Sequence, residues 1–343
     1  MSDAAMEHRN PIYRDIIDHP AAWTSASLGS DPKRQLTLTL SPEQRAAIDR
    51  VLRGIAHMPV QSIERKHAAD PVFEALARDV EAELADGRGL IVVHGIDRAA
   101  YSNEECERIF WALGTHMGDA AVQNKQGDQI THVTQDKAHP TERGYRSSAE
   151  LSPHTDAYAI LGLMCLDRSE SGGFSHAASA LAIHNEILGT RPDLLPALYE
   201  GTHYATLDAR GTSLGPTPEK VPLFSCVDGK VSVFFSRQNS NEAVRQSGEP
   251  LDPAFAEGAD LFERLARDER FRIEFMLDPG EIMFVNNYVL VHARTEFEDS
   301  ERHKRDLLRL WLNNAPMRPV LPELHLFAKL YKDLFALQAG TAK

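Results

Sequence analysis

Cysteine, long apolar runs and positive charge are all scarce in this sequence, and each scarcity excludes a class of protein. The 343 residues include only three cysteines, Cys106, Cys165 and Cys226, which lie far apart and form no CxxC pair. This usage predicts a reduced, cytoplasmic protein without a disulfide framework. No apolar run approaches the length of a membrane span, and residues 1–20 lack the basic-then-apolar pattern of a signal peptide.

The deficit of positive charge bears on the partners of the protein. Lysine and arginine number 37 against 50 aspartates and glutamates, which gives a formal net charge of −13. Such a surface repels phosphate backbones and anionic headgroups, so we expect neither nucleic acid nor membrane as a partner. No glycine-rich phosphate loop joins the strand predicted at 89–96 to the helix predicted at 102–118, so nucleotide binding has no support. The composition leaves a homo-oligomer open.

The pattern of apolar residues predicts helices first and short strands later. Capped amphipathic helices are expected after Ser41 and over 71–87 and 102–118, while residues 1–45 otherwise look irregular. From about residue 120, short β-rich runs alternate with turn signals and with helical inserts near 179–189 and 254–268. This texture predicts a mostly β fold with flanking helices, a jelly-roll (double-stranded β-helix) or barrel core. A last amphipathic helix is expected over 321–338.

The same change of texture suggests how the chain is organised. Residues 1–88 are expected to form a helical N-terminal extension packed on the core. Residues 89–343 are expected to form the jelly-roll domain with its inserts, and the two parts together one structural unit. A chain with 42% apolar residues has enough of them for a core of this size.

Two His-x-Asp/Glu triplets are candidates for a metal site. On an extended backbone, residues i and i+2 point the same way and can chelate one ion, whereas on a helix they splay apart. His184-Asn185-Glu186 lies within a stretch of helical periodicity, so we interpret it as part of a helix surface. His154-Thr155-Asp156 follows Pro153 and leads into an apolar strand, which favours it as a chelate.

Two further features of the sequence support the second triplet. His292 follows a strand that opens from a DPG turn, and a polar loop separates it from the strand DLLRLWL. In that strand Arg305, Leu307, Arg309 and Trp311 share one face, and the other face is nearly all leucine. Guanidinium groups inside an apolar core are tolerable only where they meet anions, and they pair bidentately with carboxylates. The alternative is a surface strand whose polar face lies in water.

These segments together resemble a known family. HTD (154–156), SGGFS (171–175), NNYVLVHARTEF (286–297) and RDLLRLWL (305–312) are similar, in order and spacing, to the clavaminate synthase-like and taurine dioxygenase (TauD/TfdA) superfamily of Fe(II)/2-oxoglutarate oxygenases. The resemblance spans roughly residues 90–315 and leaves the first 85 or so unmatched. It implies a jelly-roll enzyme that uses Fe(II), 2-oxoglutarate and O₂ to oxidise a small molecule, most often by hydroxylation.

The resemblance also implies a role for each matching residue. His154, Asp156 and His292 would hold the iron, and Arg305 would bind the remote carboxylate of 2-oxoglutarate. Ser175 stands nearest to the position from which a hydroxyl usually contacts that carboxylate. Arg309 would hold an anionic group of the substrate, such as the carboxylate of an amino acid or small organic acid. HAR at 292–294 replaces the more usual HGR, and we expect Arg294 to pair with Glu296, Glu298 or Asp299.

Several assignments stay open at this point. Weaker candidates for the lining of the substrate pocket are Gln123, Asn124, Tyr145, Arg146, Ser148 and Glu150. The same histidines and aspartate would also suit a jelly-roll metalloenzyme that does not use 2-oxoglutarate, such as a zinc hydrolase or a cupin-type enzyme. A non-catalytic small-molecule sensor on the same fold is a third reading.

Overall fold

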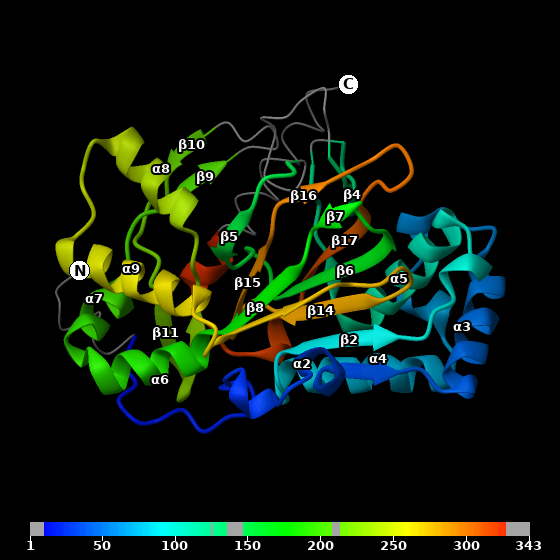
Figure 1. Ribbon diagram of the computed structural model, residues 1–343, viewed down its shortest axis with the longest axis horizontal. Helices are drawn as coiled ribbons and strands as arrows, with labels where there is room; N and C mark the ends of the chain where they lie inside the picture. Colours follow the sequence, from blue (N-terminus) through cyan, green and yellow to red (C-terminus); the bar gives the residue numbers. More distant parts are fainter. Residues whose placement is uncertain (1–9, 125, 136–146, 208–212, 327–343) are drawn as a thin grey trace.

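A computed structural model describes residues 10–124, 126–135, 147–207 and 213–326. Two β-sheets lie at its centre, with helices packed on their outer sides (Figure 1). The larger sheet has the order β1 (Thr37–Thr39), β2 (Leu90–His94), β14 (Ile282–Asn286), β6 (Ile160–Asp167), β17 (Asp306–Asn313) and β3 (Asp119–Ala120), with β4 (Ile130–Val133) also paired to β17. The smaller sheet has the order β13 (Arg272–Phe275), β8 (Ser175–Ser179), β15 (Leu290–Arg294) and β5 (Leu151–His154).

Three two-stranded ribbons and eight α-helices complete the part of the chain that the structure describes. The ribbons pair β9 (Ala205–Leu207) with β10 (Ser213–Pro216), β11 (Phe224–Val227) with β12 (Lys230–Val233), and β7 (Ser171–Gly172) with β16 (Phe297–Glu298). The helices are α2 (Pro32–Gln35), α3 (Pro42–Ile55), α4 (Pro71–Ala85), α5 (Asn103–Met117), α6 (Ala180–Thr190), α7 (Leu195–Glu200), α8 (Arg237–Ser247) and α9 (Pro253–Arg267). None of these helices combines the length and apolar character needed to cross a bilayer.

Strand β17 shows how the sheets create two cores. Its Leu308, Leu310 and Leu312 are at most 1% exposed and join the core that the larger sheet shares with α3, α4 and α5. Its Leu307 and Trp311 point the other way and join the core between the two sheets. The alternation read from the sequence is therefore confirmed, and it places the intervening Arg309 between the sheets.

The predicted jelly-roll class is confirmed, with corrections at the ends of the chain. The strands form an open sandwich of two sheets, so the barrel alternative is wrong. Residues 1–45 are not irregular throughout, because β1 pairs in parallel with β2 and adds an edge to the larger sheet. Capping boxes at Ser41 and Ser102 begin α3 and α5 as the sequence predicts. Most of the helix expected over 321–338 lies outside the described residues.

An ion triad at the edge of the larger sheet predicts how stability depends on pH. His132 of β4 lies 2.7 Å from an oxygen of Asp306 and 3.1 Å from one of Glu107, and these two partners raise the pKa of His132 to about 10. A pKa raised in the folded state stabilises the fold below the unfolded value of about 6.5, and this contribution is lost as the pH rises toward 10. We expect His132→Gln to lower the urea midpoint at pH 6 and to have a smaller effect at pH 10. An equal loss at both pH values would contradict this assignment.

Candidate metal centre

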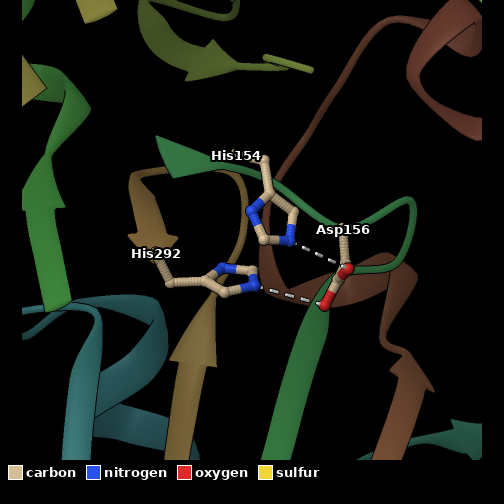
Figure 2. A group of neighbouring side chains, drawn as sticks. All are labelled: His154, Asp156 and His292. Atoms are coloured by element: carbon tan, nitrogen blue, oxygen red, sulfur yellow. Dashed lines mark ion pairs between the residues drawn. The ribbon is translucent and has the colours of Figure 1, made fainter. Parts of the chain in front are cut away.

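Three side chains that are distant in the sequence meet between the sheets. His154 ends β5 and is the direct cross-strand partner of His292 on β15, and the two rings lie 4.4 Å apart between centroids. Asp156 follows two residues later, with its oxygens 4.0 Å from His154 Nε2 and 3.6 Å from His292 Nε2. Figure 2 shows the three groups pointing toward one another. One ligand atom from each lies within 4.8 Å of the other two, and they are the one such group among the described residues.

The backbone around Asp156 explains how the triplet reaches this place. β5 belongs to the smaller sheet and β6 to the larger one, so residues 155–159 cross between the sheets. Thr155 is fixed in the crossing by backbone and hydroxyl hydrogen bonds with Phe235. The backbone N–H of Asp156 donates to the side chain of Asn287, whose amide donates in turn to the carbonyl of Tyr158. The crossing segment, residues 155–159, therefore fixes the carboxylate of Asp156 between the two sheets.

The electrostatics of the triad suit a divalent cation. Burial alone would raise the pKa of Asp156, but His292, His154, Arg309 and a hydrogen bond from Trp311 outweigh it and hold that pKa below its usual range. Burial, with repulsion from His154, lowers the pKa of His292 to about 3. An ionised carboxylate beside neutral imidazole is the protonation state that binds metal. Two histidines and one carboxylate on one side of an ion are the donor set of non-haem Fe(II) oxygenases.

Outer contacts orient two of these donors. His154 Nδ1 lies 2.8 Å from the carbonyl of Ser152, which turns Nε2 toward the other two groups. Trp311 Nε1 donates to Asp156 Oδ2 over 2.9 Å and leaves the second oxygen of the carboxylate available. The indole stacks on Tyr158 at 5.2 Å, and the guanidinium of Arg309 lies 3.9 Å from the indole centroid. The sequence predicted the face on which Trp311 lies but not its contact with the triad.

The triad opens into a cavity of about 70 Å³ between the sheets, which Ser175, Arg305 and Arg309 also line. Arg305 is 5% exposed, and its Nη1 is buried without a hydrogen-bond partner among the described residues. Burial lowers the pKa of this guanidinium to about 10. A cation buried in this way is stabilised once an anion enters the cavity beside it. The remote carboxylate of 2-oxoglutarate fits this requirement, and Ser175 lines the same cavity.

Arg309 lies deeper in β17 and is held by Gln123. The Arg309 Nε donates to Gln123 Oε1 over 2.7 Å, and the amide of Gln123 donates to the Arg309 carbonyl over 2.9 Å. Thr131 donates to the same Gln123 oxygen. Gln123 is 1% exposed, so this candidate for the pocket lining lies behind Arg309 and fixes its direction.

Two of the other weak candidates for the lining of the substrate pocket, Glu150 and Ser148, do not line the cavity. Glu150 pairs with Arg267 on an exposed part of the surface, and Ser148 accepts a hydrogen bond from Gln135. Tyr145 and Arg146 lie outside the described residues.

The expected ion pair of Arg294 is wrong. Its guanidinium donates to the backbone carbonyls of Ser147, Ala149 and Thr295, and no carboxylate of a described residue lies within ion-pair distance. Burial, followed by repulsion from Arg305, lowers the pKa of Arg294 to about 9.

The competing triplet at 184–186 lies on α6, as predicted, but His184 is fully buried and not on the helix surface. Its Nε2 lies 2.9 Å from the hydroxyl of Tyr199, and burial lowers the pKa of His184 to about 4. We expect His184→Ala to destabilise the fold by about 2 kcal/mol or more, since it opens a cavity and removes a buried hydrogen bond of the Tyr199 hydroxyl. Iron binding and turnover per folded molecule should stay unchanged; a folded variant without activity would favour this triplet as the metal site.

Comparison with known proteins identifies the family. The family model for the taurine catabolism dioxygenase TauD, TfdA family matches residues 61–311. FR-33289 synthase of Streptomyces rubellomurinus (strain ATCC 31215) is 29% identical over 318 residues, which cover 88% of this chain and 91% of the relative. The crystal structure of an asparagine oxygenase with Fe(II), 2S,3S-3-hydroxyasparagine and succinate aligns with a TM-score of 0.65 at 18% identity, over 83% of this chain and 97% of that one. The non-heme iron oxygenase OrfP with Fe, succinate and (3S)-hydroxy-L-Arg aligns with a TM-score of 0.61 at 14% identity, over 81% and 94%. The chain therefore belongs to the TauD/TfdA family and is an Fe(II)- and 2-oxoglutarate-dependent oxygenase.

Proposed function

We propose that His154, Asp156 and His292 hold the Fe(II) and that the enzyme hydroxylates an unactivated C–H bond of a small amino acid or another carboxylate-bearing metabolite. The observation that carries the proposal is the meeting of the three donors in a cavity whose other polar lining includes buried arginines. When bound, Fe(II) and 2-oxoglutarate supply the oxidising chemistry, in which O₂ is consumed, succinate and CO₂ are released and one oxygen atom enters the substrate.

The roles of the protein's own residues follow from their places. Arg305 and Ser175 bind the remote carboxylate of 2-oxoglutarate, so that the keto-acid end reaches the metal. Trp311 holds one oxygen of Asp156 and so keeps the carboxylate in one orientation.

The substrate class rests on Arg309. Its guanidinium is directed by Gln123 and lies over the indole of Trp311, close enough to Asp156 to lower the pKa of that carboxyl. A carboxylate held by Arg309 would place the neighbouring carbon atoms of a small substrate beside the metal. The asparagine oxygenase and OrfP structures contain hydroxylated amino acids, which supports an amino acid as the class to test first.

Two measurements test the proposal in order. Anaerobic titration with Fe(II) and 2-oxoglutarate should give the weak visible charge-transfer band of the chelate. Succinate release in the presence of each of the twenty amino acids and of simple dicarboxylates should then exceed the rate without substrate for at least one carboxylate-bearing compound. Absence of the band would contradict the metal assignment. A band with stimulation only by compounds that lack a carboxylate would contradict the substrate class.

A further inference from the structure

We propose that Arg294 is a second anchor for the remote carboxylate of 2-oxoglutarate, so that two guanidinium groups share this anion. The inference rests on the proposed role of Arg305 and extends it. Sequence reasoning placed Arg294 in a structural ion pair, yet no carboxylate of a described residue meets it.

The position of Arg294 directs it into the same cavity. It follows His292 by two residues on β15, so both side chains lie on the face that points between the sheets. Its cross-strand partner on β8 is Ser175, whose hydroxyl we assign to the remote carboxylate. Arg294, Ser175 and Arg305 all line the cavity that contains the triad.

The hydrogen bonds of Arg294 leave one end of the guanidinium for an anion. Nη2 donates to the carbonyls of Ser147 and Ala149, and Nε donates to the carbonyl of Thr295 over 3.3 Å. Nη1 is buried and has no partner among the described residues, which is also true of Nη1 of Arg305.

The charges of the two arginines complete the argument. Their guanidinium carbons lie 4.8 Å and 5.2 Å from the ring centroid of Phe297, which brings two like charges to the same aromatic side chain. Two buried cations that repel each other are stabilised by an anion that both can contact. The remote carboxylate of 2-oxoglutarate, with two oxygens and a full charge, meets this need beside Ser175.

The test uses a pair of probes that differ only at the remote end. 2-Oxopentanoate keeps the keto-acid chelate and has a methyl group where 2-oxoglutarate has its second carboxylate. The dissociation constants of both are measured with the Fe(II) protein under anaerobic conditions, from the charge-transfer band. The ratio of the two constants reports the contacts of the remote carboxylate and does not depend on turnover or on the identity of the substrate.

Arg294→Gln should raise the dissociation constant of 2-oxoglutarate by about 10-fold, because one charge-assisted hydrogen bond is lost. The dissociation constant of 2-oxopentanoate should stay within about 2-fold of the wild-type value. If the variant weakened the binding of both probes equally, the ratio of their dissociation constants would not change, and the proposal would be overturned. Unchanged binding of both probes would overturn it as well. Arg318→Gln is the matched control. Arg318 is also 5% exposed and donates to a backbone carbonyl, that of Val231, but it does not line the cavity. This variant should keep the wild-type ratio.

A second variant keeps the proposal testable if Arg294→Gln does not fold. Arg305→Gln should still prefer 2-oxoglutarate over 2-oxopentanoate by about 10-fold, because Arg294 remains. Complete loss of the preference would mean that Arg305 is the sole anchor. Failure of the wild type to give a band with 2-oxoglutarate would overturn the proposed function instead, so the two failures are distinguishable.

Discussion

Asp156→Ala is expected to abolish iron binding and turnover while leaving the fold in place. The substitution removes the one carboxylate among the three donors and leaves two imidazoles, which hold Fe(II) poorly. Loss of an outer contact of a metal ligand costs about 10–100-fold in affinity, so loss of the ligand itself should exceed about 100-fold. The measurement is anaerobic titration with Fe(II) at saturating 2-oxoglutarate, together with far-UV circular dichroism to confirm folding.

The control for this variant is Trp311→Phe. It removes the hydrogen bond to Asp156 Oδ2 but keeps the carboxylate and most of the aromatic packing on Tyr158. We expect iron affinity to fall by about 10-fold to 100-fold, between the wild type and Asp156→Ala. Undiminished iron binding in Asp156→Ala would show that the metal lies elsewhere.

The backbone conformation of each triplet could be predicted from the sequence because it depends on local geometry. Apolar residues at helical spacing around His184 predicted α6, and Pro153 before His154 predicted an extended chain. What local pattern could not supply was burial. His184 was expected on a helix surface, yet it lies at 0% exposure because α6 packs against α9 and because Tyr199 of α7 and Phe224 of β11 contact the imidazole ring.

The contacts that orient the site were beyond the sequence for the same reason. Trp311 reaches Asp156 across 155 residues, and Gln123 reaches Arg309 across 186. Alternation along β17 predicted which side chains share a face, but the identity of the partner depends on how two sheets are stacked. For Arg294, the sequence suggested a partner that the fold does not provide. Three nearby acidic residues in the sequence suggested an ion pair, whereas the fold turns the guanidinium inward to backbone carbonyls.

The edge strand β1 shows a limit of a different kind. Three residues of β1 carry too little periodicity to be recognised, and their pairing with β2 spans more than 50 residues. By contrast, β17 has eight residues and is apolar, so the run DLLRLWL predicted it to within one residue. Length and burial, more than composition, decided which elements could be read in advance.

Arg305→Met is expected to change stability and binding in opposite directions. Without metal or 2-oxoglutarate, the variant should be more stable than the wild type by about 1 kcal/mol or more, because methionine removes a buried charge that no described carboxylate pairs with. Its affinity for 2-oxoglutarate should fall by about 100-fold, since the main charge-assisted contact to the remote carboxylate is gone. Urea unfolding of the metal-free proteins measures the first effect, and the anaerobic titration measures the second.

The order of stabilities should then reverse when ligand is added. At one saturating Fe(II) concentration for both proteins, 2-oxoglutarate at about 100 times its wild-type dissociation constant adds about 2.7 kcal/mol to the stability of the wild type and only a few tenths to that of the variant. The reversal has one cause: the guanidinium of Arg305 is already buried before the carboxylate that it binds enters the cavity. A variant less stable than the wild type in the absence of ligand would show that the guanidinium is already compensated within the protein. In that case its burial would be structural, and the proposed anchoring of 2-oxoglutarate by Arg305 would lose its physical basis.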